Sequence, residues 1–558
     1  MKAWRWMLAL AVVARAAAQA ATYHVDINHP QAADTNAGTA EAPFKTVQAA
    51  VDRAQAGDTV LVHGGTYREP IAWRNPGRPD ARCTLMAAPG ETVVVKGSIV
   101  VTNWQPADAR AAGLAADFPG ANIWVRQGWE RRNIHPPDAP KLPHYHEVNY
   151  DDIRQAFYRD AVMEGAGRLT AAFLPHEFEE GRLYVDRVGK QLFIWLPPGI
   201  DPNRDGVEVS IYPSLFSGTY GTGQPSDSLD YVTVRGIQFR HASGTAVTTM
   251  DGTETAVEDC IVTWNYRSAI YVRGHRNRIL RNTFGYSGSG GLTGAREGHL
   301  FEDNLVIGNN LDNHVYFNNS GGGKLTNLNK CTFRRHKAMH NNGCGLWLDC
   351  ECNDNVFEDC VFSHNAGVGL DIEISRRNLV RNCIFAYNVP RPSGYAISHA
   401  GKQANQRTYD AGGGGWGLTS RNSDGTRVYH CLFYGNWEGG LMLGGGKRVW
   451  KEKDPKTGAE IVKSVGGDDL VAMNNILANN GRWQLQMVNP ARDTNAVGCR
   501  SDYNLFWGPN PVDGFGTLAQ WARDSGQDRH SLYERPDVPF GLDGNFELPS
   551  TSPAVDAG

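Results

Sequence analysis

A short motif that recurs through the second half of the chain constrains the fold most. Each copy alternates hydrophobic residues around a polar centre that ends in Cys, Asn or Thr: Val257–Val262, Leu280–Phe284, Phe301–Val306, Phe357–Phe362, Val380–Phe385 and Val428–Phe433. Taking 260, 283, 304, 360, 383 and 431 as equivalent positions, the steps are 23, 21, 56, 23 and 48 residues. We interpret these steps as one, one, two, one and two turns of about 22–28 residues, a period typical of a solenoid. Short alternating strands with Asn or Gly at the corners predict an all-β parallel β-helix.

Composition agrees with a large, turn-rich β protein. Gly accounts for 63 of 558 residues, aromatic residues for 10% and charged residues for 20%. A long helical array would hold less Gly, which costs about 1 kcal/mol relative to Ala in a helix. A disordered chain would carry fewer aromatics and more charge. The net charge of -4 provides no basic field for nucleic acid, and the body of the chain has no run of about 20 apolar residues that would predict a membrane span.

Cysteines and asparagines recur in register with the repeat. Cys260, Cys360, Cys383 and Cys431 share one position, and we expect Cys331 to share it. Because hydrophobic strand residues flank them, we predict that these thiols are free, buried and stacked inward. A second ladder follows five residues later and predicts stacked corner asparagines: Asn265, Asn309, Asn365, Asn388, Asn436 and Asn480.

Cys350 and Cys352 stand apart from this ladder, on either side of Glu351. A zinc site built from spaced cysteine pairs needs a second pair, which the sequence does not offer. We therefore do not predict a metal site here.

The N-terminal segment has the pattern of an export signal. Met1–Trp6 is basic, Met7–Ala14 is apolar, and Ala18–Ala20 has the small-residue pattern of a cleavage site. We expect cleavage after Ala20 and a secreted or periplasmic protein. Beyond it, Phe44–Ala54 has the i, i+3, i+4 spacing of an amphipathic helix, which we expect to cover the open end of the first turn.

Residues 101–230 do not repeat in this way. Arg182–Asp186 and Gln191–Leu196 predict a β-hairpin, and we interpret the region as an inserted small β-sandwich that forms one wall of a substrate cleft. The expected organisation is a signal over 1–20, a cap and first turns over 21–100, the insert over 101–230, and the main β-helix over 231–558.

Two consecutive turns carry the strongest chemical signal. Gly345–Asp349 and Gly369–Glu373 align without a gap. The period of two predicts that the leucines and isoleucine of both segments face inward. The outward-facing residues are then Trp347, Asp349, Asp371 and Glu373.

The spacing of these acids distinguishes two hydrolytic mechanisms. Asp349 and Glu373 are one turn apart, and neighbouring strands lie about 4.8 Å apart, so their carboxylates should be roughly 5 Å apart. Retaining glycosidases hold their carboxyls about 5–5.5 Å apart and inverting ones about 6.5–9.5 Å. Asp371 lies two residues along the strand, roughly 8 Å from Asp349, and that pair would suit inversion.

Like charges this close need a counterion or a shared proton. One carboxyl with a raised pKa is what a general acid requires. The alternatives are an acidic patch in contact with water or a bound Ca²⁺ ion. The predicted reaction itself requires no cofactor.

The neighbourhood of the pair is consistent with a carbohydrate substrate. Trp347 is placed to stack on a sugar ring, and Lys324 is expected to be a substrate donor or a counterion. The glycines of 321–323 would open room on that face. Further residues expected to line the groove are Asn318, Asn319, Trp416 and Glu438.

Two stretches resemble known families. Gly38–Glu69, "GTAEAPFKTVQAAVDRAQAGDTVLVHGGTYRE", resembles the N-terminal cap of secreted right-handed parallel β-helix enzymes. The motifs "GGGKLT", "GLWLDC" and "GVGLDIEIS" resemble those of β-helix glycoside hydrolases, and with the insert they resemble glycoside hydrolase family 120, the β-xylosidases. The resemblance implies that Asp349 is the nucleophile and Glu373 the acid/base. With these roles, we expect Asp371 to bind a sugar hydroxyl.

Two other classes of function remain open on this fold. A polysaccharide lyase acting on a uronate polymer needs cations and a basic residue, for which Lys324, Arg376, Arg377 and Arg381 are available. A non-catalytic carbohydrate-binding solenoid would not require two like charges one turn apart. Because acids rather than bases are stacked in one register, the sequence favours a glycoside hydrolase.

Overall fold

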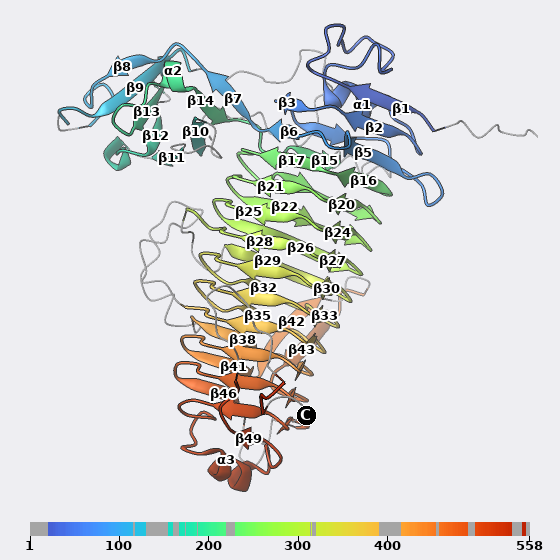
Figure 1. Cartoon of the computed structure of the whole chain (residues 1–558), viewed down its shortest axis with the longest axis vertical. Coiled ribbons are helices and arrows are strands. Elements are labelled where there is room, and N and C mark those ends of the chain that lie inside the picture. Colours follow the sequence, from blue (N-terminus) through green and yellow to red (C-terminus); the bar gives the residue numbers. More distant parts are fainter. Residues whose placement is uncertain are drawn as a thin grey trace, which may run out of the picture.

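A computed structural model describes residues 20–114, 118–129, 154–159, 167–172, 175–186, 188–218, 229–312, 314, 320–389, 414–453, 457–488, 497–537 and 550–553. Three parallel sheets run along the long axis of the molecule, and successive turns stack on one another (Figure 1). Residues 1–19 of the predicted export signal lie outside the described part of the chain.

Sheet A begins with the first strand of the chain and takes one strand from each turn. Its strands, in spatial order, are β1 (Thr22–Val25), β2 (Thr59–Val62), β5 (Cys83–Ala87), β16 (Val232–Arg235), β20 (Ala256–Glu258), β24 (Arg278–Leu280), β27 (Leu300–Glu302), β30 (Thr332–Arg334), β33 (Val356–Glu358), β36 (Leu379–Arg381), β39 (Arg427–Tyr429), β44 (Val471–Met473) and β47 (Arg500–Asp502).

Sheet B follows sheet A within each turn. Its strands are β3 (Gly65–Tyr67), β6 (Val93–Lys96), β17 (Ile237–Arg240), β21 (Ile261–Thr263), β25 (Thr283–Gly285), β28 (Leu305–Ile307), β31 (Lys337–Met339), β34 (Val361–Ser363), β37 (Ile384–Ala386), β40 (Leu432–Tyr434), β45 (Ile476–Ala478), β48 (Leu505–Trp507) and β49 (Leu532–Tyr533).

Sheet C closes each turn and carries the acidic residues. Its strands are β4 (Ile71–Trp73), β15 (Phe216–Gly218), β18 (Val247–Thr248), β22 (Ser268–Val272), β26 (Gly290–Glu297), β29 (Gly321–Asn329), β32 (Leu346–Asp349), β35 (Leu370–Glu373), β38 (Trp416–Arg421), β41 (Gly439–Gly444) and β46 (Trp483–Met487), with the short β19 (Gly252–Thr253) and β23 (Gly274–His275) alongside.

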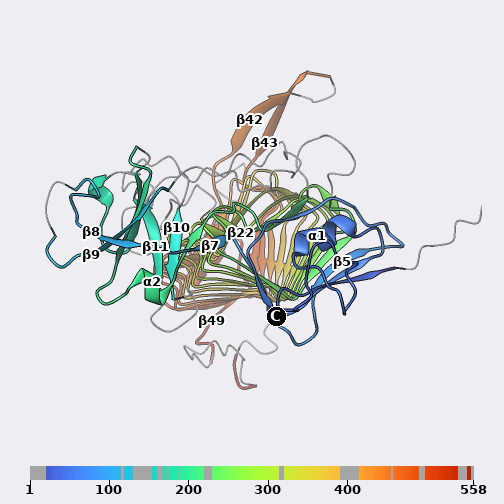
Figure 2. The same cartoon turned by 90° about the horizontal axis from the view of Figure 1, so that it is seen from above.

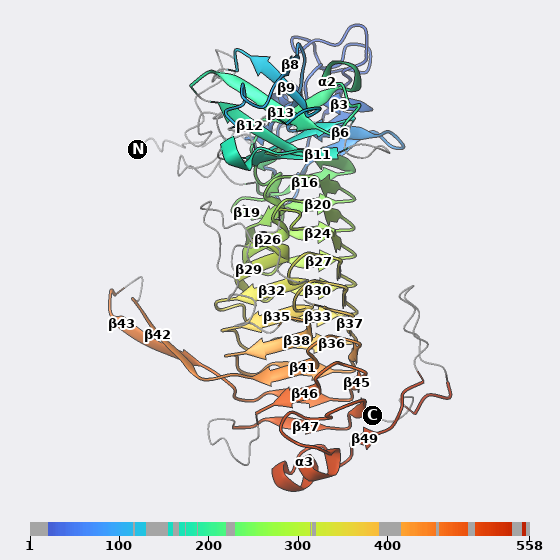
Figure 3. The same ribbon diagram turned by 90° about the vertical axis from the view of Figure 1, so that its left-hand side faces the viewer.

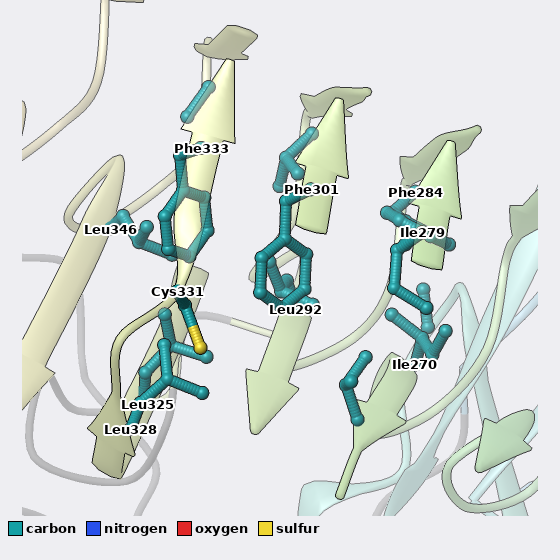
Figure 4. Close-up of a cluster of buried hydrophobic side chains, with 14 of the residues drawn as sticks. Ile270, Ile279, Phe284, Leu292, Phe301, Leu325, Leu328, Cys331, Phe333 and Leu346 are labelled. Carbon is teal, nitrogen blue, oxygen red and sulfur yellow. The ribbon is translucent and has the colours of Figure 1, made fainter. Parts of the chain in front are cut away.

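The core fills the space between the three sheets. Figure 4 shows how side chains of consecutive turns repeat inside the solenoid, and Phe301 and Phe333 stack with their ring centroids 4.4 Å apart. The residues predicted to face inward on β32 and β35 belong to this buried core: Leu346, Leu348, Leu370 and Ile372. The parallel β-helix predicted from the repeat is confirmed.

A short helix lies at the N-terminal end of the solenoid. α1 (Val47–Arg53) buries Val47, Ala50 and Val51 in the same core, and the Thr46 hydroxyl accepts a hydrogen bond from the Ala49 N–H at its N-terminus. The predicted helix over 44–54 is therefore present in a shorter form. At the other end, α3 (Leu518–Ser525) buries Leu518 and Trp521 (Figure 1). The helices in the described part of the chain are too short or too polar to span a bilayer.

The inserted region forms one curled sheet rather than the predicted β-sandwich. Its strands, in spatial order, are β7 (Ser98–Val101), β14 (Val207–Ser210), β10 (Gln155–Tyr158), β11 (Gly167–Ala172), β12 (Arg182–Asp186), β13 (Gln191–Leu196), β9 (Asn122–Gln127) and β8 (Gln105–Ala107), with α2 (Pro202–Asp205) before β14. All its strand pairs are antiparallel except β11 with β12. The β12–β13 hairpin has the predicted bounds.

The single sheet follows from the apolar sequence of β13. Leu192 and Ile194 enter one hydrophobic cluster of the insert, whereas Phe193 and Trp195 enter another on the opposite face. One curled sheet contacts both hydrophobic clusters, so the insert buries them without the second sheet of a sandwich. The strands of the insert run from Ser98 to Ser210, so the sheet begins three residues before the predicted range of 101–230 and ends within it.

The predicted register is confirmed for four cysteines and corrected for the fifth, and three of the four, Cys360, Cys383 and Cys431, follow one another on consecutive turns. Cys260, Cys360, Cys383 and Cys431 are free and buried at the corner between sheets A and B. The Cys360 N–H donates to the Cys383 sulfur at 3.4 Å, and the Cys383 N–H to the Cys431 sulfur at 3.5 Å. Cys331 precedes β30 at the other end of sheet A, so the prediction that it shares this register was wrong.

One position and one turn count of the repeat also need correction. The equivalent of Cys260 is Asn282 rather than residue 283, because the Cys260 N–H donates to the Asn282 side chain at 2.9 Å. The 48-residue step from 383 to 431 is one turn and not two, because Val380 on β36 pairs directly with Val428 on β39. The additional residues fall between β37 and β38, where a long connection enlarges a single turn.

The predicted asparagine ladder runs along the corner between sheets B and C. The Asn365 side chain accepts from the Asn341 N–H at 3.2 Å and donates to the Ala338 carbonyl at 2.9 Å. Its amide also donates to the Asn388 side chain at 3.1 Å. The Asn365 side chain thus satisfies buried backbone groups of the preceding turn and bonds to the asparagine of the following turn. The ladder includes Asn341, which the sequence analysis missed.

We predict that Asn365→Ala destabilises the solenoid much more than Asn329→Ala. The first change leaves several buried groups without partners, at about 1–3 kcal/mol each. Asn329 is half-buried, and its side chain accepts from the Asn353 N–H at 3.0 Å, so water can replace that bond. Urea denaturation followed by circular dichroism measures both. Equal losses of stability would contradict a structural role for the ladder.

Candidate active site

Three neighbouring strands of sheet C, β29, β32 and β35, bring five of the predicted site residues together: Lys324, Trp347, Asp349, Asp371 and Glu373. Trp347 on β32 pairs with Asp371 on β35, and Leu348 pairs with Ile372. The next residues along the two strands are Asp349 and Glu373, which therefore lie side by side at the ends of β32 and β35. Strand spacing places their backbones about 4.8 Å apart. The predicted register of the acidic pair is confirmed.

Asp349 forms an ion pair with a lysine from the preceding turn. Lys324 Nζ lies 2.7 Å from Asp349 Oδ2, and both side chains are more than four-fifths buried. The same ammonium lies 3.5 Å from the centroid of the Trp347 ring. Lys324, expected as a substrate donor or a counterion, is a counterion that also contacts an aromatic face.

Asp371 is held by the following turn. Asp371 is fully buried. Arg421 binds both of its carboxylate oxygens, through Nε at 3.1 Å and Nη2 at 2.7 Å. The Thr419 hydroxyl donates to Asp371 Oδ1 at 2.7 Å. A carboxylate engaged in this way positions Arg421. These surroundings favour a role in holding Arg421 over the predicted binding of a sugar hydroxyl by Asp371.

Glu373 lies between two arginines. Arg421 Nη2 is 3.2 Å from Glu373 Oε2, and Arg448 Nη1 is 3.4 Å from Glu373 Oε1. The pKa of Glu373 is raised because burial disfavours its carboxylate, and the charges of Asp371 and Asp349 add to the rise. Arg421 and Arg448 act in the opposite direction without cancelling it. A buried carboxyl with a raised pKa can carry a proton into a reaction.

Trp347 is not an open platform for sugar stacking. It is 3% exposed and packs outside sheet C with Cys344, Val368 and Trp416. With Lys324 over its ring, its visible role is to support the ammonium that pairs with Asp349.

The glycines of 321–323 serve strand packing rather than open space. A Cβ atom on Gly322 would overlap the carbonyl oxygen of Gly345 on the following turn. One on Gly323 would overlap the carbonyl oxygen of Leu292 on the preceding turn. Close approach of three strands therefore requires glycine here.

The remaining predicted groove residues lie away from the acidic pair. Trp416 is buried at the start of β38 and stacks on Trp483 at 5.9 Å. Its register is five residues before that of Glu373, about 16 Å along the strand. Glu438 pairs with Arg482 at 3.3 Å. Asn318 and Asn319 lie outside the described residues.

The two cysteines around Glu351 point to different places. The exposed Cys350 donates through its sulfur to Asp349 Oδ1 at 3.1 Å, and burial together with Asp349 raises the pKa of its thiol to about 11. Cys352 faces the core. Within the described segments, no three His, Cys, Asp or Glu side chains are grouped to hold a metal ion.

The insert docks against the segment that leads into β29. Arg168 of β11 forms a nearly buried ion pair with Asp312 at 2.6 and 2.9 Å. The Gln155 amide of β10 donates to the carbonyls of Ala242 and Trp264 at 3.1 Å each. Lys324 lies further along β29. That the insert forms a wall of the cleft stays a prediction.

A second element lies at the opposite end of the sheet C strands. The hairpin of β42 (Arg448–Lys453) and β43 (Glu460–Val465) follows β41 and projects from the solenoid (Figure 3). Lys463 Nζ binds Glu351 at 2.6 Å. Seen along the solenoid, the hairpin and the insert project in different directions (Figure 2).

The arginines considered for a lyase lie outside the acidic cluster. Arg377 pairs with Asp354 at 2.6 Å and Arg381 with Glu358 at 2.6 Å. Arg376 donates to the Ser464 carbonyl at 2.7 Å. Among the described residues, the cations that contact Asp349 or Glu373 are Lys324, Arg421 and Arg448.

Arg421 and Arg448 were not predicted from the sequence. Arg421 pairs with Glu373 on the next turn, 48 residues on. The 48-residue step of the repeat could have indicated this pairing. Because that step was counted as two turns, Arg421 was not placed beside Glu373. Arg448 belongs to a hairpin outside the repeat, so no periodicity indicated its position.

Comparisons with known proteins agree on the fold. Residues 235–411 match the family described as a right handed beta helix region. The structure of XylC in complex with xylose superposes with a TM-score of 0.63 at 16% identity, covering 93% of this chain and 88% of that one. The predicted right-handed parallel β-helix is confirmed.

Curated relatives match only short stretches. Pectate lyase PEL9 of Emericella nidulans is 36% identical over 103 residues, 18% of this chain and 25% of that protein. The uncharacterized protein YwoF of Bacillus subtilis strain 168 is 37% identical over 71 residues, 13% of this chain and 15% of that one. The matched stretches thus span a quarter or less of the relatives' length.

We predict opposite pH effects on stability for Glu373→Gln and Glu358→Gln. The raised pKa of Glu373 means that its ionisation costs stability as pH rises through the folded value, so Glu373→Gln should gain Tm relative to wild type over that range. The ion pairs with Arg381 and Arg334 lower the pKa of Glu358, so its carboxylate stabilises above the unfolded pKa. Glu358→Gln should lose Tm at neutral pH and approach wild type as pH falls through the folded pKa.

Thermal unfolding of the three proteins across a pH series measures both differences. If Glu373→Gln lost Tm with rising pH as Glu358→Gln does, the raised pKa of Glu373 would be wrong.

Proposed function

We propose that this protein is an exported glycoside hydrolase that retains the anomeric configuration, with Asp349 as nucleophile and Glu373 as general acid/base. One observation carries the proposal. Two carboxylates on adjacent strands share one register, one paired with a cation and the other with a raised pKa. A retaining mechanism requires these two different states in one site.

The register argues for retention over inversion. At about 4.8 Å between strands, the two carboxyls leave no room for an attacking water between them. Inversion through Asp371 would require its carboxylate to activate water, yet Arg421 and Thr419 already bind both of its oxygens. Asp349 and Glu373 therefore suit the reaction better.

In the first step, Asp349 attacks the anomeric carbon while Glu373 gives its proton to the leaving oxygen. The glycosidic bond breaks, and an ester forms between the sugar and Asp349. The negative charge of Asp349 disappears in this step, and Lys324 then retains its contact with the Trp347 ring. Loss of the ion pair is thereby offset in part.

In the second step, the ionised Glu373 removes a proton from water. The oxygen of that water attacks the anomeric carbon and releases the Asp349 carboxylate. Arg421 and Arg448 stabilise Glu373 while it is charged. Two inversions at the same carbon restore the original configuration.

The fold neighbours agree with a carbohydrate substrate. XylC, which shares the fold, has been solved with xylose. For this chain a sugar substrate rests on the acidic pair, and export rests on the pattern of residues 1–20.

A second candidate function is a polysaccharide lyase. The local match to a pectate lyase favours it, as does the presence of three cations around the site. Each of these cations contacts an acid, so none is placed as a free base. A lyase would release an unsaturated product that absorbs in the ultraviolet, whereas a hydrolase would release a reducing sugar without that absorbance.

We predict distinct kinetic defects for the two catalytic variants. Asp349→Ala should lower kcat/KM on the order of 10⁴-fold or more for every glycoside, because no covalent intermediate can form. Glu373→Ala should slow poor leaving groups by about 10²–10⁴-fold and activated aryl glycosides far less. Azide should restore turnover to Glu373→Ala with a glycosyl azide as product.

Glu302→Ala is the matched control, since its carboxylate lies on sheet A, where it pairs with Arg334 and Arg335. Its kinetics should equal those of wild type on the same panel of aryl glycosides. A glycosyl azide of inverted configuration from Glu373→Ala, or no azide rescue of that variant, would mean that the site does not work as proposed.

A further inference from the structure

The β42–β43 hairpin delivers one side chain to the acidic pair. Arg448 is the first residue of β42 and pairs with the buried Val465 of β43. The base of the hairpin is fixed by the Lys463–Glu351 ion pair at 2.6 Å and by the hydrogen bond from Arg376 to the Ser464 carbonyl at 2.7 Å. Arg448 is therefore held at the end of the sheet C strands.

Arg448 differs in exposure from the other cations of the site. Its side chain is 54% exposed, whereas those of Arg421 and Lys324 are 19% and 12% exposed. Its Nη1 lies 3.4 Å from Glu373 Oε1, a longer contact than the 2.7 Å pairs of Lys324 with Asp349 and Arg421 with Asp371. More than half of the Arg448 side chain is thus accessible to a ligand.

Charge counting shows when this guanidinium lacks a counterion. Lys324 is offset by Asp349 and Arg421 by Asp371, which leaves Glu373 for Arg448. Once Glu373 is protonated, as a general acid must be at the start of the reaction, one positive charge remains unbalanced at Arg448. Nearby acids already have cations, because Glu351 pairs with Lys463 and Asp424 lies 3.8 Å from Arg376.

We propose that Arg448 is a specificity-determining residue that binds an oxyanion on the substrate, so that the substrate is an anionic saccharide bearing a carboxylate or a sulfate. This inference rests on the proposed glycoside hydrolase function. A guanidinium recognises either group through paired N–H donors. The anion replaces the charge that Glu373 loses on protonation.

The direction of approach places the charged group on the leaving-group side. Lys324 reaches Asp349 from β29, on the N-terminal side of the pair. Arg448 follows β41, two strands beyond β35, and reaches Glu373 from the C-terminal side. Because Glu373 protonates the leaving oxygen, Arg448 binds the sugar that departs.

The test uses three disaccharides that share the non-reducing sugar and linkage and differ in the leaving sugar: glucose, glucuronate or glucose 6-sulfate. Wild type should prefer one or both anionic substrates in kcat/KM. Arg448→Gln should reduce the ratio of anionic to neutral kcat/KM about tenfold. Arg448→Lys should keep more of that ratio for sulfate than for carboxylate, if sulfate is the group bound.

Lys451→Gln is the matched control. It removes one positive charge from the same hairpin, where Lys451 pairs with Glu460 at 2.7 Å. Its ratio should equal that of wild type. Equal kcat/KM for charged and neutral substrates in wild type would overturn the inference. Equal losses of the anionic-to-neutral ratio in Arg448→Gln and Lys451→Gln would also overturn it. In either case, hydrolysis of all three substrates would still support the proposed function.

Isothermal titration of glucuronate and glucose 6-sulfate against glucose keeps the two failures distinct. An anion that binds wild type at least tenfold more tightly than it binds Arg448→Gln supports the anion site even if no disaccharide is cleaved. Without hydrolysis of any glycoside, the proposed function fails. Affinities that are equal in the two proteins would overturn the role of Arg448.

Discussion

Parallel pairing between consecutive turns places every residue of sheet C beside its equivalent in the next turn. Because neighbouring strands lie about 4.8 Å apart, the sheet holds two acids in one register closer together than their mutual repulsion would otherwise allow. This constraint produces the pairing of Asp349 with Glu373. It also explains the internal asparagines, because each buried corner needs a side chain that bonds to the turn on either side. Fold and site therefore depend on one geometry.

Stacked like charges need opposite charges from neighbouring turns. Lys324 comes from the turn before Asp349, and Arg421 comes from the turn after Glu373 and binds Asp371. The two acids consequently lie in different environments although they lie on identical positions of adjacent strands. One has a close ammonium, and the other is buried with a raised pKa. The inherent asymmetry of a solenoid site, with different turns on its two sides, permits a nucleophile and an acid in one register.

Much of this was predictable because the repeat reports local geometry. Alternation distinguished the inward leucines from Asp349 and Glu373, and the corner asparagines and the β12–β13 hairpin followed from short-range patterns. What failed depended on contacts that spacing does not reveal. A long connection made one turn look like two, which hid Arg421, 48 residues after Glu373. Trp347 was expected at the surface, but its ring is covered by Lys324 and its neighbours.

The most direct test of the account follows the anomer that is released first. A ¹H NMR time course of hydrolysis, on a glycoside that the enzyme cleaves and faster than mutarotation, distinguishes the two outcomes. We predict that the product first appears with the configuration of the substrate, because Asp349 forms an ester before water enters. First appearance of the opposite anomer would contradict the Asp349–Glu373 assignment and require a second carboxylate that activates water directly.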